Sequence, residues 1–348
     1  MKIKEMQHHL KSKGIDLAVF ITRPNKKDFN LHYFAQADCK HAVLLIPKSS
    51  MPILFVSPLE FGSTKANVRI EKLEKRISEI ISKRFKRIKT IGINQDNITL
   101  NELKQLKKSI KAKYTDISKI CSTLRETKTE KEIRIIKRAC SITTRILNKC
   151  IKNINKFNTE QQIAEFLKSE TKKAGCELSW EPVVASGKNA AIPHHVPKGK
   201  LQKGFCIIDF GLVYKGYNSD MTRTIFLGKP TQKDRELYNL VLKAQEKAIE
   251  NARPEVPIKK LEKEARKTLG KYSKYFIHSL GHGIGVHVHE LPRISVNAKG
   301  RLKQGMVFTI EPGIYIKGKL GIRIEDDLFL VRGGIDYLTP KRKKWHFF

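Results

Sequence analysis

The second half of the chain places acidic side chains where apolar stretches end. Asp209 closes an apolar stretch, and Asp220 follows after a Lys215-Gly216 hairpin signal. An unpaired carboxylate at the end of a buried strand is costly and needs a cation or a proton. If the turn is centred between residues 214 and 215, Asp209 lies directly opposite Asp220, with Cβ atoms about 5 Å apart. Two carboxylates that close repel each other unless cations lie between them.

A histidine-rich stretch follows at residues 277–293. It contains four histidines within twelve residues: His278, His282, His287 and His289. Glycines on both sides of His282 permit tight turns and close approach of neighbouring backbone. A glycine-rich loop with incidental histidines is the alternative, and the density of histidines argues against it. His287 is the weakest candidate, because alternation places it either on the face of His289 or in solvent.

Two glutamates complete the pattern. Glu311 closes an apolar strand before Pro312-Gly313, and Glu325 lies in a strand that also carries Arg323, a possible ion-pair partner. The combined set is rich in oxygen, has one imidazole and lacks a thiolate, which suits a pair of divalent ions such as Mn, Co, Fe or Zn. Two such metals can hold a bridging hydroxide and clamp the oxygen of a tetrahedral intermediate. The set consists of Asp209, Asp220, His282, Glu311 and Glu325.

The elements that position these residues divide into two parts. The N-terminal part alternates strand-length apolar runs with helical spacing, which indicates helices packed on a sheet. It predicts strands at 17–21, 42–46, 53–56 and 90–93, and helices at 68–85 and 100–110. After a polar boundary, Thr129 and Glu132 form a capping box that predicts the start of a long helix. A further helix is expected to begin at residue 158 or 159, and short strands with glycine turns follow from about residue 180.

Composition limits the functional classes. The 348 residues include 69 Lys and Arg against 34 Asp and Glu, a net charge of +35. The cations are spread over helix faces and loops, so we expect a solvated basic surface and only non-specific nucleic-acid binding. No apolar run is long enough to span a membrane, and no secretory signal opens the chain. Six cysteines without C-x-x-C spacing indicate reduced thiols and a cytoplasmic protein.

These motifs resemble the pita-bread metallopeptidases, the group containing methionine aminopeptidase, Xaa-Pro aminopeptidase and prolidase. The stretches 209–224, 278–285, 289–293, 309–313 and 323–326 resemble the proline-peptidase branch of that group. The resemblance implies an α/β creatinase-like N-terminal domain over residues 1–122. It implies an α+β pita-bread catalytic domain over residues 123–348.

The family resemblance also implies roles. The metal ligands would be Asp209, Asp220, His282, Glu311 and Glu325, holding two divalent ions, with Mn or Co favoured over Zn or Fe. Glu311 would also move the proton of the attacking water, while His289 and His194 would act at the scissile bond and in the substrate pocket. His278, Arg293 and Arg323 would bind substrate or support the pocket. Arg293 would hold the free carboxylate of a dipeptide, and Arg323 could hold a carboxylate ligand in place.

The expected activity is hydrolysis of Xaa-Pro bonds in small peptides with proline after the first residue, by a homodimer. Arg293 and the short length favour a prolidase (Xaa-Pro dipeptidase), with an Xaa-Pro aminopeptidase acting on longer peptides as the alternative. A non-catalytic pita-bread protein that binds partners through its basic surface is a candidate of another class. Metal-free, creatinase-like amidine hydrolysis is a third. The complete set of metal ligands argues against both.

Overall fold

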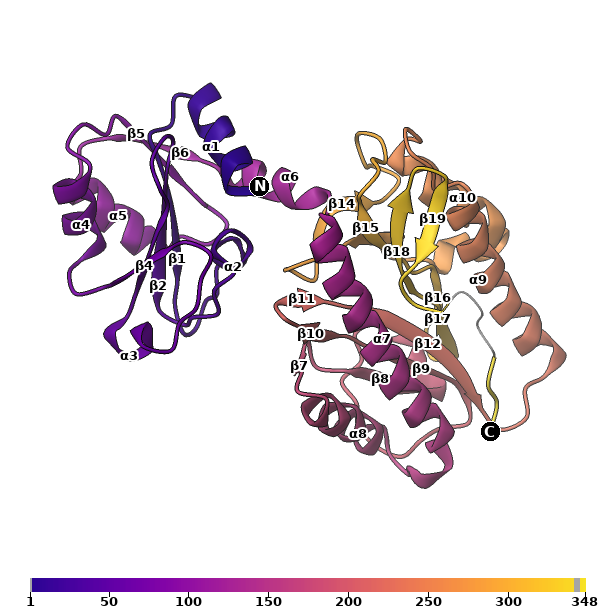
Figure 1. Cartoon of the computed structure of the whole chain (residues 1–348). Coiled ribbons are helices and arrows are strands. Elements are labelled where there is room, and N and C mark those ends of the chain that lie inside the picture. The colour runs from indigo at the N-terminus through magenta and orange to yellow at the C-terminus, as the bar shows by residue number, and fades with distance from the viewer. Residues whose placement is uncertain (1, 341–344) are drawn as a thin grey trace. The chain divides into compact units, whose positions relative to one another are not determined.

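The computed structural model describes residues 2–340 and 345–348, and the chain divides into two compact units, Met1–Arg125 and Glu126–Phe348. The boundary expected between residues 122 and 123 falls inside helix α6 (Ser118–Glu126). Figure 1 shows the elements of each unit. No helix among the described residues is long and apolar enough to cross a membrane.

The first unit is built on a six-stranded mixed sheet with the strand order β4-β3-β2-β1-β5-β6. The strands are β1 (Leu17–Thr22), β2 (Ala42–Pro47), β3 (Ile53–Val56), β4 (Arg69–Lys72), β5 (Thr90–Ile93) and β6 (Lys113–Asp116). Besides α6, the helices are α1 (Lys2–Ser12), α2 (Phe29–Ala35), α3 (Pro58–Phe61), α4 (Ile77–Arg84) and α5 (Leu100–Ser109). The four predicted strands and the helix at 100–110 are confirmed.

The single helix predicted over 68–85 is wrong in its first half. Residues Arg69–Lys72 form strand β4, which pairs in parallel with the buried strand β3, and the helix α4 begins only at Ile77. Apolar residues at Ile70 and Leu73 fit a helical stripe equally well in a short window. Pairing with the free edge of β3 favours a strand over a helix at residues 69–72. The spacing of apolar residues within a short segment carries no information about such a distant partner.

The second unit packs two layers of helices on short sheets. Its helices are α7 (Glu130–Lys152), α8 (Glu160–Lys173), α9 (Gln232–Glu250) and α10 (Ile258–Leu269), with short 3-10 turns η1 (Ile154–Lys156), η2 (Gly187–Ala191) and η3 (Gly270–Tyr275). Thr129 caps α7 with Glu132, and Thr159 caps α8 with Gln162. Both predicted helix starts are therefore confirmed.

The described strands of the second unit form four small sheets. Their orders are β12-β9-β8, β11-β10-β7, β14-β13-β15-β18-β19 and β16-β17. The early strands are β7 (Glu177–Leu178), β8 (Val183–Ser186), β9 (Gly204–Phe210), β10 (Leu212–Tyr214), β11 (Tyr217–Asn218) and β12 (Met221–Leu227). The later ones are β13 (Gly281–Gly283), β14 (Glu290–Ile294), β15 (Val307–Ile310), β16 (Gly313–Ile316), β17 (Leu320–Arg323), β18 (Asp326–Val331) and β19 (Gly334–Tyr337).

Two apolar cores fix these layers. In one, Ile146 and Leu167 of α7 and α8 pack with Ile208 of β9. In the other, Leu261 of α10 packs with Phe308 of β15, as the grouping of α9 and α10 near the later sheets in Figure 1 suggests. The predicted metal ligands lie in or next to strands of both cores. Asp209 lies in β9 of the first core, and Glu311 directly follows β15 of the second.

Candidate metal centre

The hairpin between β9 and β12 sets the separation of the two aspartates. Asp209 pairs with Thr222, so the expectation that it lies directly opposite Asp220 is wrong. The two-residue turn consists of Lys215 and Gly216, both with positive φ (48° and 79°), so it is centred one residue later than assumed. A shift of one residue in the turn moves the partner by two positions. Since side chains alternate with a period of two, Asp220 still follows the face of Thr222.

His282 lies in β13 between two strands that approach very closely. A Cβ atom on Gly281 would lie 2.0 Å from Thr309 O, and one on Gly283 would lie 2.1 Å from Leu291 O. The two glycines are therefore required by the close approach, as the sequence indicated. His282 Nδ1 donates to Gly283 O at 3.1 Å, which leaves Nε2 with a lone pair. This Nε2 atom lies 3.5 Å from Glu311 Oε1 and 3.6 Å from Asp220 Oδ2.

Glu325 reaches the same place from the connection between β17 and β18. Its Oε2 atom accepts a hydrogen bond from Thr222 Oγ1 at 2.7 Å. Asp220, His282 and Glu325 each offer a ligand atom, and these atoms lie within 4.8 Å of one another, the one such group among the described residues. Glu311 joins this group through its contact with His282.

Burial and mutual repulsion raise the pKa values of these carboxyl groups. Burial, followed by the charge of Glu325, raises the pKa of Asp220 well above its usual value. Burial likewise raises the pKa of Glu325, and it raises that of Glu311 to about 8 although Arg323 acts in the opposite direction. Burial lowers the pKa of His282 to about 4, so its ring is neutral and able to ligate near pH 7.

Two oxygen atoms of the predicted ligands have no hydrogen-bond partner although they are buried: Asp209 Oδ1 and Glu325 Oε1. Buried oxygens are normally satisfied, so each such atom needs an explanation. Carboxylate oxygens without a partner, together with a neutral imidazole, form a donor set for divalent cations. The residues present therefore fit metal ions.

A buried network supports this set. Arg323, 4% exposed, donates from Nη2 to Asp209 Oδ2 at 2.6 Å and from Nη1 to the Tyr315 hydroxyl at 2.7 Å. Its ion pair is thus with Asp209 and not with Glu325, the partner considered from the sequence. The Tyr315 hydroxyl lies 3.0 Å from Nε2 of His278, whose Nδ1 donates to Ser279 O. Arg323, Tyr315 and His278 therefore form a chain that leads away from Asp209.

Sequence reasoning missed Tyr315 and Asp327. Tyr315 lies in β16, in which residues 313 to 315 are all buried, and its place two residues after Gly313 was the one available sequence signal. The buried Oδ2 atom of Asp327 accepts from the Asp220 backbone N–H at 2.8 Å and from the Cys140 thiol at 3.2 Å. Its own sequence neighbourhood, an acidic run, gives no sign of this backbone contact.

The remaining predicted residues are more accessible. His289 is exposed, and its ring centroid lies 4.3 Å from that of His282 in an edge-to-face arrangement. Arg293 is exposed, pairs with His282 across β13 and β14, and donates from Nε to Ser279 Oγ at 3.0 Å. His194 is exposed on the segment after η2, and its charge helps to lower the pKa of His289, which burial lowers first. His289 and Arg293 are thus neighbours of His282, and His194 is close enough to His289 to affect its pKa.

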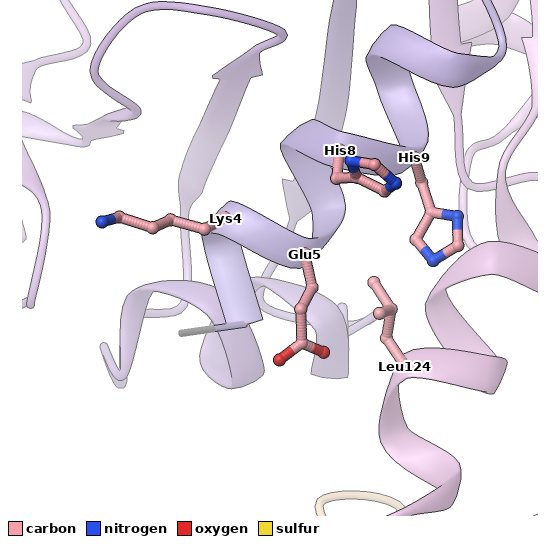
Figure 2. Close-up of a pocket in the computed structure, with 5 residues that line it drawn as sticks. All are labelled: Lys4, Glu5, His8, His9 and Leu124. Atoms are coloured by element: carbon pink, nitrogen blue, oxygen red, sulfur yellow. The ribbon is translucent and has the colours of Figure 1, made fainter.

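Another cavity, of about 330 Å³, lies in the first unit between α1 and α6. Figure 2 shows its lining residues, which are Lys4, Glu5, His8, His9 and Leu124. Although an acid and two histidines lie on adjacent turns there, they do not form a metal-ligand group within the described residues. This cavity contains none of the predicted site residues.

Comparison with known proteins agrees with this architecture. Residues 134–332 match metallopeptidase family M24, and residues 2–127 match the creatinase/prolidase N-terminal domain. The chain therefore belongs to metallopeptidase family M24, and it combines the pita-bread catalytic fold with a creatinase-type N-terminal domain. Membership implies a metal-dependent hydrolase that uses divalent ions.

Particular relatives include a Xaa-Pro dipeptidase of Pyrococcus horikoshii, which is 34% identical and is aligned over 99% of this chain and 98% of its own. The crystal structure of the prolidase from the same organism superposes with a TM-score of 0.90, at 33% identity and 99% coverage of both chains. An X-Pro aminopeptidase structure from Thermotoga maritima gives a TM-score of 0.89 at 30% identity, covering 96% of this chain and 98% of its own.

Proposed function

We propose that this protein is a Xaa-Pro dipeptidase, a prolidase, that hydrolyses dipeptides with proline in second position. The observation that carries the proposal is the convergence of Asp220, His282, Glu325 and Glu311 in a chain similar to prolidases over its full length. A Xaa-Pro bond lacks an N–H and is conformationally restricted. A dedicated pocket is needed for the proline ring.

The ligands proposed for two divalent ions are Asp209, Asp220, His282, Glu311 and Glu325. Their oxygen-rich chemistry favours Mn or Co, with Zn or Fe as further possibilities. When bound, such ions supply Lewis acidity and lower the pKa of water. Arg323 holds Asp209 in a fixed orientation through its 2.6 Å hydrogen bond, so a buried guanidinium acts on a ligand and not directly on substrate.

The chain's own residues would then handle protons and substrate. Glu311 would accept a proton from the attacking water and return it to the departing proline nitrogen. His289 and His194 are exposed beside the cluster and can contact the scissile bond. Arg293 lies opposite His282 in the strand ladder, where its guanidinium can hold the dipeptide carboxylate. His278 would support the substrate site through its 3.0 Å contact with the Tyr315 hydroxyl.

A panel of three peptides tests the proposal. The protein is stripped of metal, reloaded with Mn or Co, and assayed on Ala-Pro, Ala-Pro-Ala and Ala-Ala. Cleavage of Ala-Pro alone supports the dipeptidase, whereas cleavage of Ala-Pro-Ala supports an aminopeptidase, the alternative that the Thermotoga relative favours. A folded, metal-loaded protein that cleaves none of the three contradicts a peptidase function and favours a binding protein.

Arg293→Ala separates the two peptidases further. It should raise KM for Ala-Pro about tenfold, because a bidentate ion pair to the carboxylate is lost. The effect on Ala-Pro-Ala should be smaller, since the carboxylate there lies one residue farther away. Equal effects on both peptides would remove the carboxylate role from Arg293.

The proposal includes a domain boundary between residues 122 and 123, a homodimer and a cytoplasmic location. All six cysteines are free and five are buried, which is compatible with a reducing compartment. Light scattering coupled to size exclusion tests the dimer, whose expected mass is twice the 39.9 kDa of one chain.

A further inference from the structure

Another buried carboxylate of the same unit lies at the first turn of α8. Glu160 is 0% exposed, and its carboxylate accepts five hydrogen bonds. Oε1 accepts from Ser186 N at 2.7 Å, from Ser186 Oγ at 2.8 Å and from Asn189 Nδ2 at 3.0 Å. Oε2 accepts from His195 Nε2 at 2.8 Å and from Lys198 N at 3.0 Å. No other part of the proposed mechanism uses this group.

The five donors all belong to one segment, residues 186–198, which carries His194. His195 is 5% exposed and points to Glu160, whereas the adjacent His194 is exposed. The apolar side chains on either side of this pair, Ile192 and Val196, are 52% and 74% exposed. The two neighbouring histidines therefore have opposite environments: one is an internal anchor and the other is available to a ligand.

The same segment is tied to the metal centre at its other side. Arg323 Nη1 donates to Pro193 O at 3.5 Å, a long hydrogen bond, while Nη2 of the same guanidinium binds Asp209. The segment before His194, η2, packs on β17, the strand that carries Arg323. His194 is thus held between Glu160 through His195 and Arg323 through Pro193.

We propose that Glu160 and His195 form a clamp that positions His194, with Ile192 and Val196 beside it, against the bound peptide. The inference rests on the proposed peptidase function. Neither Glu160 nor His195 touches the reacting atoms, so both are positioning residues. A fully satisfied carboxylate is suited to this task, because all five bonds must break before the segment can move.

A double-mutant cycle tests the clamp. Glu160→Gln replaces one acceptor oxygen with a donor, so donors from the segment lose their partner. It should raise KM for Ala-Pro about tenfold while kcat changes by less than about twofold, because the metal ligands are untouched. In a His194→Ala background the same substitution should change KM by less than about twofold, since coupled residues are non-additive. Glu165→Gln on the same helix, at an exposed side chain paired with Lys168, is the matched control and should leave KM unchanged.

An equal KM effect of Glu160→Gln in both backgrounds, or a loss of bound metal, would overturn the clamp in favour of general scaffolding. If Glu160→Gln does not fold, His195→Gln and His195→Ala replace it. The glutamine of His195→Gln can still donate to Glu160, so the KM of this variant should stay near the wild-type value. His195→Ala removes the donor and should raise KM. A wild-type KM in His195→Ala overturns the inference. An inactive wild-type protein overturns the proposed function and this inference with it. An active wild-type with an unaffected Glu160→Gln overturns the clamp alone.

Discussion

Two buried carboxylate sites of the second unit, Glu160 and the metal centre, differ in how far protein hydrogen-bond donors satisfy their oxygens. At Glu160 burial raises the pKa, but hydrogen bonds from Ser186, Asn189 and Lys198 outweigh burial and the net pKa is lowered. At the metal centre burial and neighbouring acids raise the pKa of Asp220 and Glu325, and one oxygen of Glu325 has no partner. The chain can therefore satisfy a buried carboxylate fully with its own donors. Where it does not, the missing positive charge corresponds to the proposed cations.

The largest expected effect is that of Asp220→Asn. It removes one charge and one ligand oxygen from the centre of the cluster, so hydrolysis of Ala-Pro should fall by on the order of a thousandfold or more. The same change removes a repulsive charge, so the metal-free variant should be more stable than the metal-free wild type at pH 8. Rate assays and urea unfolding measure the two effects. Wild-type turnover in this variant would refute the ligand assignment.

The second prediction concerns the pH dependence of the metal-free protein. Glu311 has a pKa near 4.5 when unfolded and about 8 when folded, so the folded state binds more protons between these values. Its stability contribution is present below about pH 4.5 and is lost as the pH rises through about 8. Asp220 and Glu325 act in the same direction.

Urea unfolding of the metal-free protein should therefore show stability falling from pH 7 to pH 9, above the range in which His278 and His282, whose pKa values burial lowers to about 4, oppose the carboxyl groups. Added Mn should restore it, because ions that bind only the folded state stabilise it. The same profile with and without Mn would contradict a cation site.

The smallest effect is expected at the Glu160 site, and its sign is opposite. Because the folded pKa of Glu160 is lowered, its contribution is present above about pH 4.5 and is lost as the pH falls through the lower folded value. Glu160→Gln should cost about 1–3 kcal/mol at pH 7, the usual range for leaving buried groups unsatisfied. The difference from wild type should shrink at pH 3.5. A constant difference would mean that charge does not matter at this site.

The same contrast explains what the sequence could predict. Acids at strand ends and glycines around His282 are local patterns, and the resemblance they carried led to the family that the comparisons identify. The turn between Asp209 and Asp220 was predicted one residue too early. Lys215 adopts a positive φ there, which is uncommon for a residue other than glycine and was not expected from the sequence. The helix expected at 68–85 failed where pairing with β3 overrode local spacing.

The supporting residues were beyond the reach of local patterns. Glu160 and His195 are 35 positions apart, and Arg323 and Asp209 are 114 apart. Glu160 is the first residue of a helix whose start the sequence predicted, and nothing in its neighbourhood pointed to the buried hydrogen bonds that it accepts. The sequence did not distinguish His195 from the adjacent His194, because only the structure shows that His195 is buried and His194 is exposed.

The most direct test of the account counts bound ions. Folded, metal-free wild-type protein and Asp220→Asn are dialysed against Mn at equal free concentration, and the bound metal is measured by elemental analysis beside activity on Ala-Pro. We expect two ions per wild-type chain, fewer than one in the variant, and activity that rises with occupancy. A wild-type protein that cleaves Ala-Pro at full rate with no bound ion would contradict it.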